Sequence, residues 1–164
     1  MSAKSSDKAS GGLTHLSARG EARMVDIAAK PPTKRVAIAE ARVLLGADAR
    51  RALRSGVHKG DVFAVSRLAG IQAAKKTSEL IPLCHPIALT HVAVDLKTKR
   101  WGVLITARAE TVAPTGVEME AMTAASTAAL TLYDMLKAVE RGIVVESVRL
   151  MKKSGGRSGL WKRD

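Results

Sequence analysis

Two acidic residues and a lysine within one helical stretch are the side chains of this sequence best placed to do chemistry. The stretch runs over residues 114–141, and Glu120, Asp134 and Lys137 share one side of it at about 100° per residue. Acids and an amine so placed can donate, accept and carry protons. Small and hydroxyl-bearing residues accompany them where a solvated face would carry Lys, Glu and Gln, which indicates that something covers this side. The alternative is that Asp134 and Lys137 form a plain surface ion pair.

A proline-braced loop at residues 80–86 holds a second candidate, the pair Cys84-His85. Pro82 and Pro86 remove two amide donors and favour extended geometry in the residues before them. The loop is therefore stiff and gives the imidazole of His85 a defined direction, which general acid–base work requires. The alternatives are a structural histidine and a cysteine that acts only as a small buried hydrophobe.

Two basic segments could bind an anion. Lys59 lies two residues before Asp61, a good N-cap for a helix to about Thr77, where exposed amides and the helix dipole favour negative charge. Residues 152–159 combine three cations and two hydroxyls with glycines that allow close backbone approach. They do not form a P-loop, because the Lys-Ser pair precedes the glycines. A solvated loop lysine and a flexible basic tail are the alternatives.

The charge balance favours an anionic partner. Lys and Arg number 27 and Asp and Glu 15, a net charge of +12. Aromatic residues make up only 2% of the chain, so it lacks a platform on which unpaired bases could stack. A small polyphosphate ligand therefore accounts for the charge better than nucleic acid does.

Composition predicts one globular domain in a reducing compartment. The 164 residues are 46% hydrophobic and 26% charged. No apolar run is long enough to span a bilayer, and the N-terminus lacks the apolar centre of a secretory signal, so we expect no membrane contact and a cytoplasmic location. A single cysteine, Cys84, excludes an internal disulfide and a multi-cysteine metal site. We expect residues 1–12 to be a disordered lead-in, residues 13–159 to be the domain, and residues 160–164 to be a tail without a recognisable pattern.

The elements that must position these residues follow from hydrophobic periodicity. Strands are expected at 24–29, 33–45, 88–96, 101–112 and 143–151, helices at 61–77 and 115–140, and a short helix or turn at 47–54. The main order, β-α-β-β-α-β, is the split βαβ arrangement of a ferredoxin-like α+β domain, with an antiparallel sheet and two helices on one face.

The last helix is expected to be about 35 Å long. Thr115 and Glu118 form its capping box, Glu140 is its last residue and Gly142 closes it. Its core-facing stripe is expected to comprise Val117, Ala121, Ala125, Ala128, Leu132, Met135 and Val139.

Five segments, in order and over nearly all of residues 13–159, resemble the MoaC family of molybdenum cofactor biosynthesis. They are HKGDVF at 58–63, AGIQAAKKTSELIPLCHP at 69–86, TGVEMEAMTAAS at 115–126, LYDMLKA at 132–138 and VRLMKKSGGRSG at 148–159. The resemblance implies a lyase, a cyclic pyranopterin monophosphate synthase, that converts 3′,8-cyclo-7,8-dihydro-GTP to cyclic pyranopterin monophosphate and releases diphosphate. It also implies a homohexamer, a trimer of dimers, in which two chains form each pocket. No cofactor and no protein metal site are implied, although a divalent ion could accompany the triphosphate.

The same resemblance assigns roles to individual residues. The catalytic set is Asp134, Lys137, His85 and Lys59. The substrate-binding set is Leu83, Cys84, His85, Glu118, Met119, Glu120, Lys153 and Arg157. In the mechanism we expect, Asp134 orients Lys137 as a general acid or base, and His85 handles a second proton. Lys59, Lys153 and Arg157 would bind the triphosphate, although many family members have a lysine in place of Arg157.

Two other functions fit the fold. An RNA-binding module would show a steep salt dependence and would need exposed aromatics on its sheet, where the strands offer only Trp101. A nucleotide sensor would bind GTP-like ligands without releasing diphosphate.

Overall fold

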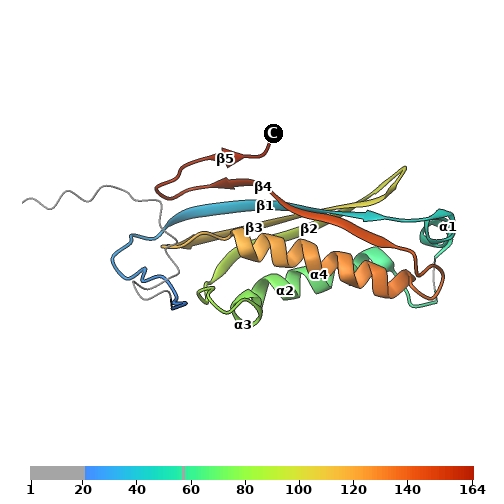
Figure 1. Cartoon of the computed structure of the whole chain (residues 1–164), viewed down its shortest axis with the longest axis horizontal. Coiled ribbons are helices and arrows are strands. Elements are labelled where there is room, and N and C mark those ends of the chain that lie inside the picture. Colours follow the sequence, from blue (N-terminus) through green and yellow to red (C-terminus); the bar gives the residue numbers. More distant parts are fainter. Residues whose placement is uncertain (1–20, 57) are drawn as a thin grey trace, which may run out of the picture.

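The computed structural model describes residues 21–56 and 58–164, so the expected lead-in at residues 1–12 lies outside the described residues. In the described part the chain forms four helices and five strands (Figure 1). Their order is β1 (Thr33–Leu44), α1 (Ala47–Ser55), α2 (Val62–Lys75), α3 (Thr77–Leu80), β2 (Leu89–Lys99), β3 (Gly102–Ala113), α4 (Glu118–Leu136), β4 (Val144–Ser154) and β5 (Trp161–Lys162).

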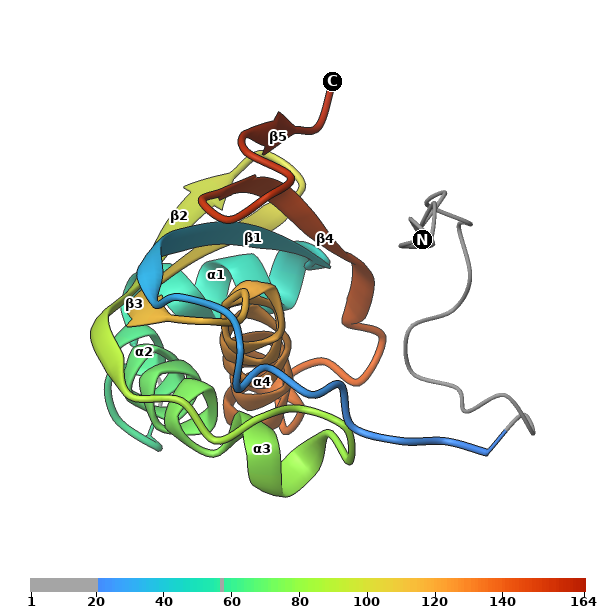
Figure 2. The ribbon, with the colours of Figure 1, turned by 90° about the vertical axis from the view of Figure 1, so that its left-hand side faces the viewer.

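The strands form one antiparallel sheet in the order β2-β3-β1-β4-β5. In its register Ala39 of β1 lies between Ala107 of β3 and Leu150 of β4. Figures 1 and 2 show α2 and α4 side by side on one face of the sheet. The predicted ferredoxin-like α+β fold is confirmed, with α1, α3 and β5 as additions to the β-α-β-β-α-β core.

Small side chains let the helices approach the sheet closely. Alternate residues of β1 and β3 point toward the helices and include several alanines, and half of the buried residues of α4 are alanine. At Gly70 of α2 an added Cβ would lie 2.8 Å from the carbonyl oxygen of Ala124. Alanine and glycine therefore set the spacing of the layers, because larger side chains would force them apart.

The long helix is shorter than predicted. It begins at Glu118, and Val117 takes the N-cap position without a side-chain cap among the described residues, so the predicted capping box of Thr115 and Glu118 is wrong. It ends at Leu136, whose carbonyl accepts from the amides of both Val139 and Glu140 in a tightened last turn. The length is about 28 Å rather than 35 Å.

The predicted core stripe of this helix is confirmed from Val117 to Met135 but fails at Val139, which is 47% exposed beyond the helix end. The same turn brings the side chain of Glu140 to the start of α1. Its carboxylate accepts hydrogen bonds of 2.8 Å from the Gly46 amide and 3.0 Å from the Ala49 amide at the start of α1. Gly142 therefore does not close the helix, and Glu140 caps a different one.

The predictions for the rest of the chain are confirmed only in part. Asp61 caps α2 as expected, accepting from the Phe63 and Ala64 amides. Residues 24–29 do not form the predicted strand, because Asp26 instead accepts from the Ala28 amide and starts a turn. The tail at 160–164 contains β5, which pairs with β4. Among the described residues, no helix is both long and apolar enough to cross a membrane.

Candidate functional site

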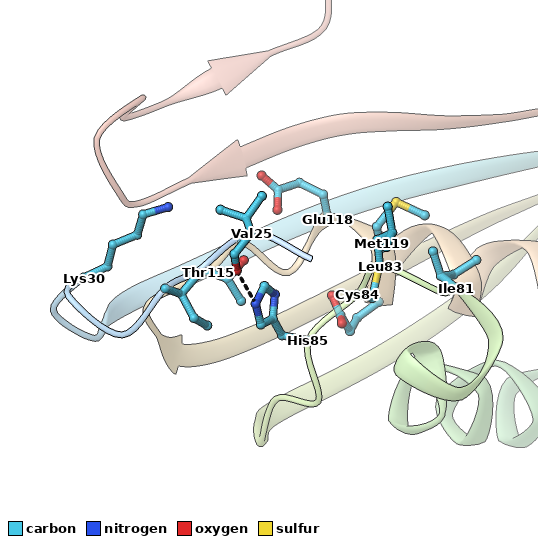
Figure 3. Close-up of a pocket in the computed structure, with 12 residues that line it drawn as sticks. Val25, Lys30, Ile81, Leu83, Cys84, His85, Thr115, Glu118 and Met119 are labelled. Carbon is cyan, nitrogen blue, oxygen red and sulfur yellow. Dashed lines mark hydrogen bonds between the residues drawn. The ribbon is translucent and has the colours of Figure 1, made fainter. Parts of the chain in front are cut away.

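Three segments that are distant in sequence enclose a pocket of about 570 Å³ at the N-terminal end of α4. They are the segment before β1, the proline-braced loop after α3, and the turn leading into α4 (Figures 1 and 3). The lining residues among the predicted substrate contacts are Leu83, Cys84, His85, Glu118, Met119 and Glu120. The structure thus brings six of the predicted site residues together.

His85 is held by backbone on two sides. The amide of the preceding Cys84 donates to the carbonyl of Ile81 over 3.0 Å, which closes the loop into a turn. The Nε2 atom of His85 lies 2.8 Å from the carbonyl oxygen of Val25, as Figure 3 shows. Because a carbonyl oxygen only accepts, Nε2 carries the hydrogen and donates it.

Glu120 is the buried acid of this pocket, with only 4% of its surface exposed. Burial raises its pKa from 4.5 to about 7; a backbone hydrogen bond opposes the rise, and the neighbouring charge of Glu118 adds to it. Burial, and then Glu120, also raise the pKa of the Cys84 thiol. The pocket therefore holds a carboxyl group that can gain or lose a proton near neutrality, and a thiol that stays protonated.

A second pocket of about 510 Å³ adjoins the first and is basic. The two share Lys30, Thr115, Gly116 and Glu118 in their walls. The second pocket adds Arg35, Pro114, Lys153, Arg157 and Ser158, so four cations face a single carboxylate. Such a wall suits a ligand with several phosphate oxygens.

Glycines shape this basic wall. Gly155 and Gly156 have φ of 96° and 72°, a region that other residues rarely adopt. A Cβ at Gly156 would collide with the guanidinium of Arg35, and one at Gly155 with the backbone of Lys34. The turn therefore lies directly against β1, and Lys153 is held by a hydrogen bond from its Nζ to Ser158 Oγ.

Lys30 and Arg35 were not among the predicted site residues. Arg35 donates to the carbonyl of Pro114 over 3.4 Å, and its buried Nε has no partner among the described residues. Each looks like an ordinary surface cation in sequence, one before a proline and one at the start of a strand. The pairing of β1 with β3 places Arg35, and the turn closed by the hydrogen bond from the Lys30 amide to the Ile27 carbonyl holds Lys30.

The remaining predicted residues form a separate cluster at the other end of α4. Lys137 Nζ lies 2.6 Å from Asp134 Oδ1, and Lys59 Nζ lies 3.4 Å from Oδ2 while it donates to the Asp134 carbonyl over 2.8 Å. Hydrogen bonds from Lys137 and then Lys59 lower the pKa of Asp134, and the hydrogen bond to Asp134 raises the pKa of Lys137. All three side chains are about half exposed.

The two groups do not meet within one chain. Glu120 and Asp134 are fourteen positions apart on α4, about 21 Å along the helix axis. The predicted catalytic set is therefore split, with His85 at one end of the helix and Lys59, Asp134 and Lys137 at the other. Lys153 and Arg157 lie with His85 at the pocket end.

Carboxyl, imidazole and thiol groups do not gather as a metal site in the described part of the chain. It contains no group of three or more His, Cys, Asp or Glu residues that could hold a metal ion.

Fold and site together define a ferredoxin-like α+β protein with a basic pocket beside a buried acid and an imidazole. The MoaC family model matches residues 24–156. A curated relative from Thermomicrobium roseum (strain ATCC 27502 / DSM 5159 / P-2) is 57% identical over 155 residues, which cover 93% of each chain, and is named cyclic pyranopterin monophosphate synthase. The chain belongs to the MoaC family, as its sequence motifs predicted.

Proposed function

We propose that this protein is a cyclic pyranopterin monophosphate synthase, a lyase that acts in the cytoplasm in molybdenum cofactor biosynthesis. It would convert 3′,8-cyclo-7,8-dihydro-GTP to cyclic pyranopterin monophosphate and release diphosphate. The observation that carries the proposal is the pair of adjoining pockets, one holding Glu120 and His85 and the other walled by four cations. The extensive identity to the Thermomicrobium relative supports the same reaction.

The two pockets divide the substrate between them. The fused ring system enters the first pocket, whose lining includes the apolar Val25, Ile27 and Leu83. The triphosphate extends into the second, where Lys30, Arg35, Lys153 and Arg157 counter its charge and that of the departing diphosphate. A sugar oxygen attacks the α-phosphorus there and closes the cyclic phosphate.

The rearrangement of the rings needs groups that move protons near neutral pH. Glu120, with a pKa raised to about 7, is suited to both donating and accepting, and His85 lies in the same pocket. Lys137, unlike Glu120, stays in one protonation state near neutral pH, because Asp134 raises the pKa of Lys137 and keeps its ammonium group charged. This favours Lys137 as a general acid or a cation for the phosphates over a general base.

We infer that a second copy of the chain completes each site, in a trimer of dimers. The outer side of α4 supports this inference, because Leu130 is 62% exposed between the pocket and the charged cluster, and Met119 in the pocket wall is 37% exposed. If two such helices pair antiparallel about a two-fold axis, the start of one lies against the end of the other. Asp134 and Lys137 of one chain then face the pocket of its partner, and the exposed apolar side chains are buried.

Incubation of the purified protein with the cyclised dihydro-GTP substrate tests the proposal. We expect the pterin product, detected by fluorescence after oxidation, and one diphosphate per turnover. Arg35→Ala should weaken substrate binding strongly, whereas Lys97→Ala, which removes an exposed cation of the edge strand β2, should not. Substrate binding without diphosphate release would instead identify a sensor, and salt-sensitive RNA binding without turnover would identify an RNA-binding module.

A further inference from the structure

We propose that the backbone carbonyl of Val25 selects the tautomer of His85 and makes Nδ1 the nitrogen that exchanges protons with the substrate. The inference rests on the proposed function for its last step only. The choice of tautomer is a property of the free protein. The segment that contains Val25, residues 21–32, precedes β1 and was not part of any predicted site.

This segment is anchored in the pocket by alternate residues. Val25 and Ile27 are half-buried and line the pocket, whereas Met24 and Asp26 are exposed. Two hydrogen bonds shape the turn that follows, from the Ala28 amide to Asp26 Oδ1 over 2.9 Å and from the Lys30 amide to the Ile27 carbonyl over 3.0 Å. The carbonyl of Val25 is thus held in place by the turn that follows and by the partial burial of the Val25 and Ile27 side chains.

The opposite side of His85 is also fixed. The loop between Pro82 and Pro86 has little freedom, and its turn is closed by the hydrogen bond from Cys84 to Ile81. The imidazole is therefore held between two rigid backbone segments, 60 residues apart in sequence, which meet in the 2.8 Å contact of Nε2 with the Val25 carbonyl. Figure 3 shows this contact from the side of the pocket.

A neutral imidazole carries one hydrogen, and the bond to Val25 requires that it be on Nε2. The lone pair is then on Nδ1, which can take a proton from the substrate. In the imidazolium that results, Nε2–H still donates to the Val25 carbonyl. The dipole of this carbonyl therefore stabilises the positive charge of the ring. The proton later returns from Nδ1 to the rearranged ring, and the imidazole is restored without leaving its anchor.

The direct measurement is ¹⁵N NMR of the histidine-labelled full-length protein without substrate, at a pH where the imidazole is neutral. The resonances of His85 are assigned by their loss in His85→Gln. We expect a protonated Nε2 and an unprotonated Nδ1. A hydrogen on Nδ1, or an even mixture of the two tautomers, would overturn the proposal. The other three histidines serve as internal references.

Substitutions that weaken the anchoring of residues 21–32 test the function of the contact between His85 and the Val25 carbonyl. In Val25→Ala/Ile27→Ala the anchor is weakened, so we expect tautomer exchange at His85 and a kcat lower by about tenfold or more, with a smaller change in KM. Met24→Ala is the matched control, because this apolar neighbour is 51% exposed and lies outside the pocket. A double variant with unchanged tautomer and unchanged kcat would contradict the positioning role.

The two proposals fail in different ways. A wild-type protein with His85 in the Nε2–H form but no pterin product would refute the proposed function and leave the tautomer selection intact. Full turnover with His85 in the Nδ1–H form would refute the tautomer selection alone.

Discussion

Glu120 shows how a single residue acquires a chemical role from its surroundings. Its carboxyl group is nearly inaccessible to solvent at the start of α4, and desolvation raises its pKa to about 7. At neutral pH the protonated and ionised forms of Glu120 are therefore both populated, which suits a group that must donate and accept protons.

This residue also makes the folded state sensitive to pH. Because the pKa of Glu120 is higher in the native state than its usual 4.5, its contribution to stability is complete below pH 4.5 and is lost as pH rises through about 7. Glu120→Gln should remove this component, which is roughly 3 kcal/mol at most. Urea unfolding at pH 5 and pH 8 measures it, and a wild-type decline that the variant shares would count against a raised pKa.

Lys137 and Asp134 should act as a unit. Lys137→Ala or Asp134→Ala should lower kcat by about a hundredfold or more while leaving the fold intact, because both groups are exposed and their ion pair adds little to stability. Arg141→Ala removes an exposed cation just beyond α4 and is the control. Substrate turnover and circular dichroism together separate the outcomes, and full activity in Lys137→Ala would exclude its proposed role.

At the scale of residues, sequence motifs predicted those parts of the site that are contiguous. Leu83 to His85 and Glu118 to Glu120 lie in short segments with distinctive composition, and both line the pocket. Lys30 and Arg35 carry no local signal. The position of Arg35 depends on strand pairing and on the glycine turn that packs against β1, and Lys30 lies in the turn before that strand. The split of the site along α4 could have been expected from helix geometry alone, because fourteen residues separate Glu120 from Asp134.

At the scale of elements, periodicity predicted the sheet better than it predicted helix ends. The strands β1 to β4 and the Asp61 cap follow from local patterns, whereas the strand expected at 24–29 is absent and β5 was not predicted. The helix α4 ends where its last turn tightens at Leu136. That ending depends on Glu140 reaching the amides of Gly46 and Ala49, more than 90 residues earlier in the chain. A capping interaction between distant segments does not change the hydrophobic periodicity of the sequence, so periodicity cannot predict it.

The capping role of Glu140 gives a stability prediction. Glu140→Ala should lower the free energy of unfolding by about 1 kcal/mol, because two amides at the start of α1 lose their acceptor. Glu79→Ala, which removes an equal charge from an exposed pair with Lys76, should change it little. Thermal or urea unfolding distinguishes them, and equal effects of the two substitutions would contradict the cap.

At the scale of the whole molecule, the predicted site residues form two groups at opposite ends of one helix, α4. The pocket with His85 and the adjoining pocket with the four cations lie at the start of α4, and the cluster of Lys59, Asp134 and Lys137 lies at its end. The proposed dimer joins one group from each of two chains. Neither group alone holds all the acids, bases and cations that the reaction requires.

Mixing two inactive variants tests this central claim most directly. His85→Ala and Lys137→Ala are each expected to lose turnover, but co-assembled in equal amounts they should regain about a quarter of wild-type activity, because half of randomly formed dimers contain one intact site of two. Asp134→Ala mixed with Lys137→Ala is the control: these residues are in contact in the same chain, so every site would remain damaged and no activity should return. Recovered activity in the first mixture alone is the predicted result. No recovery from a mixture whose subunits have demonstrably exchanged would contradict a site shared between two chains.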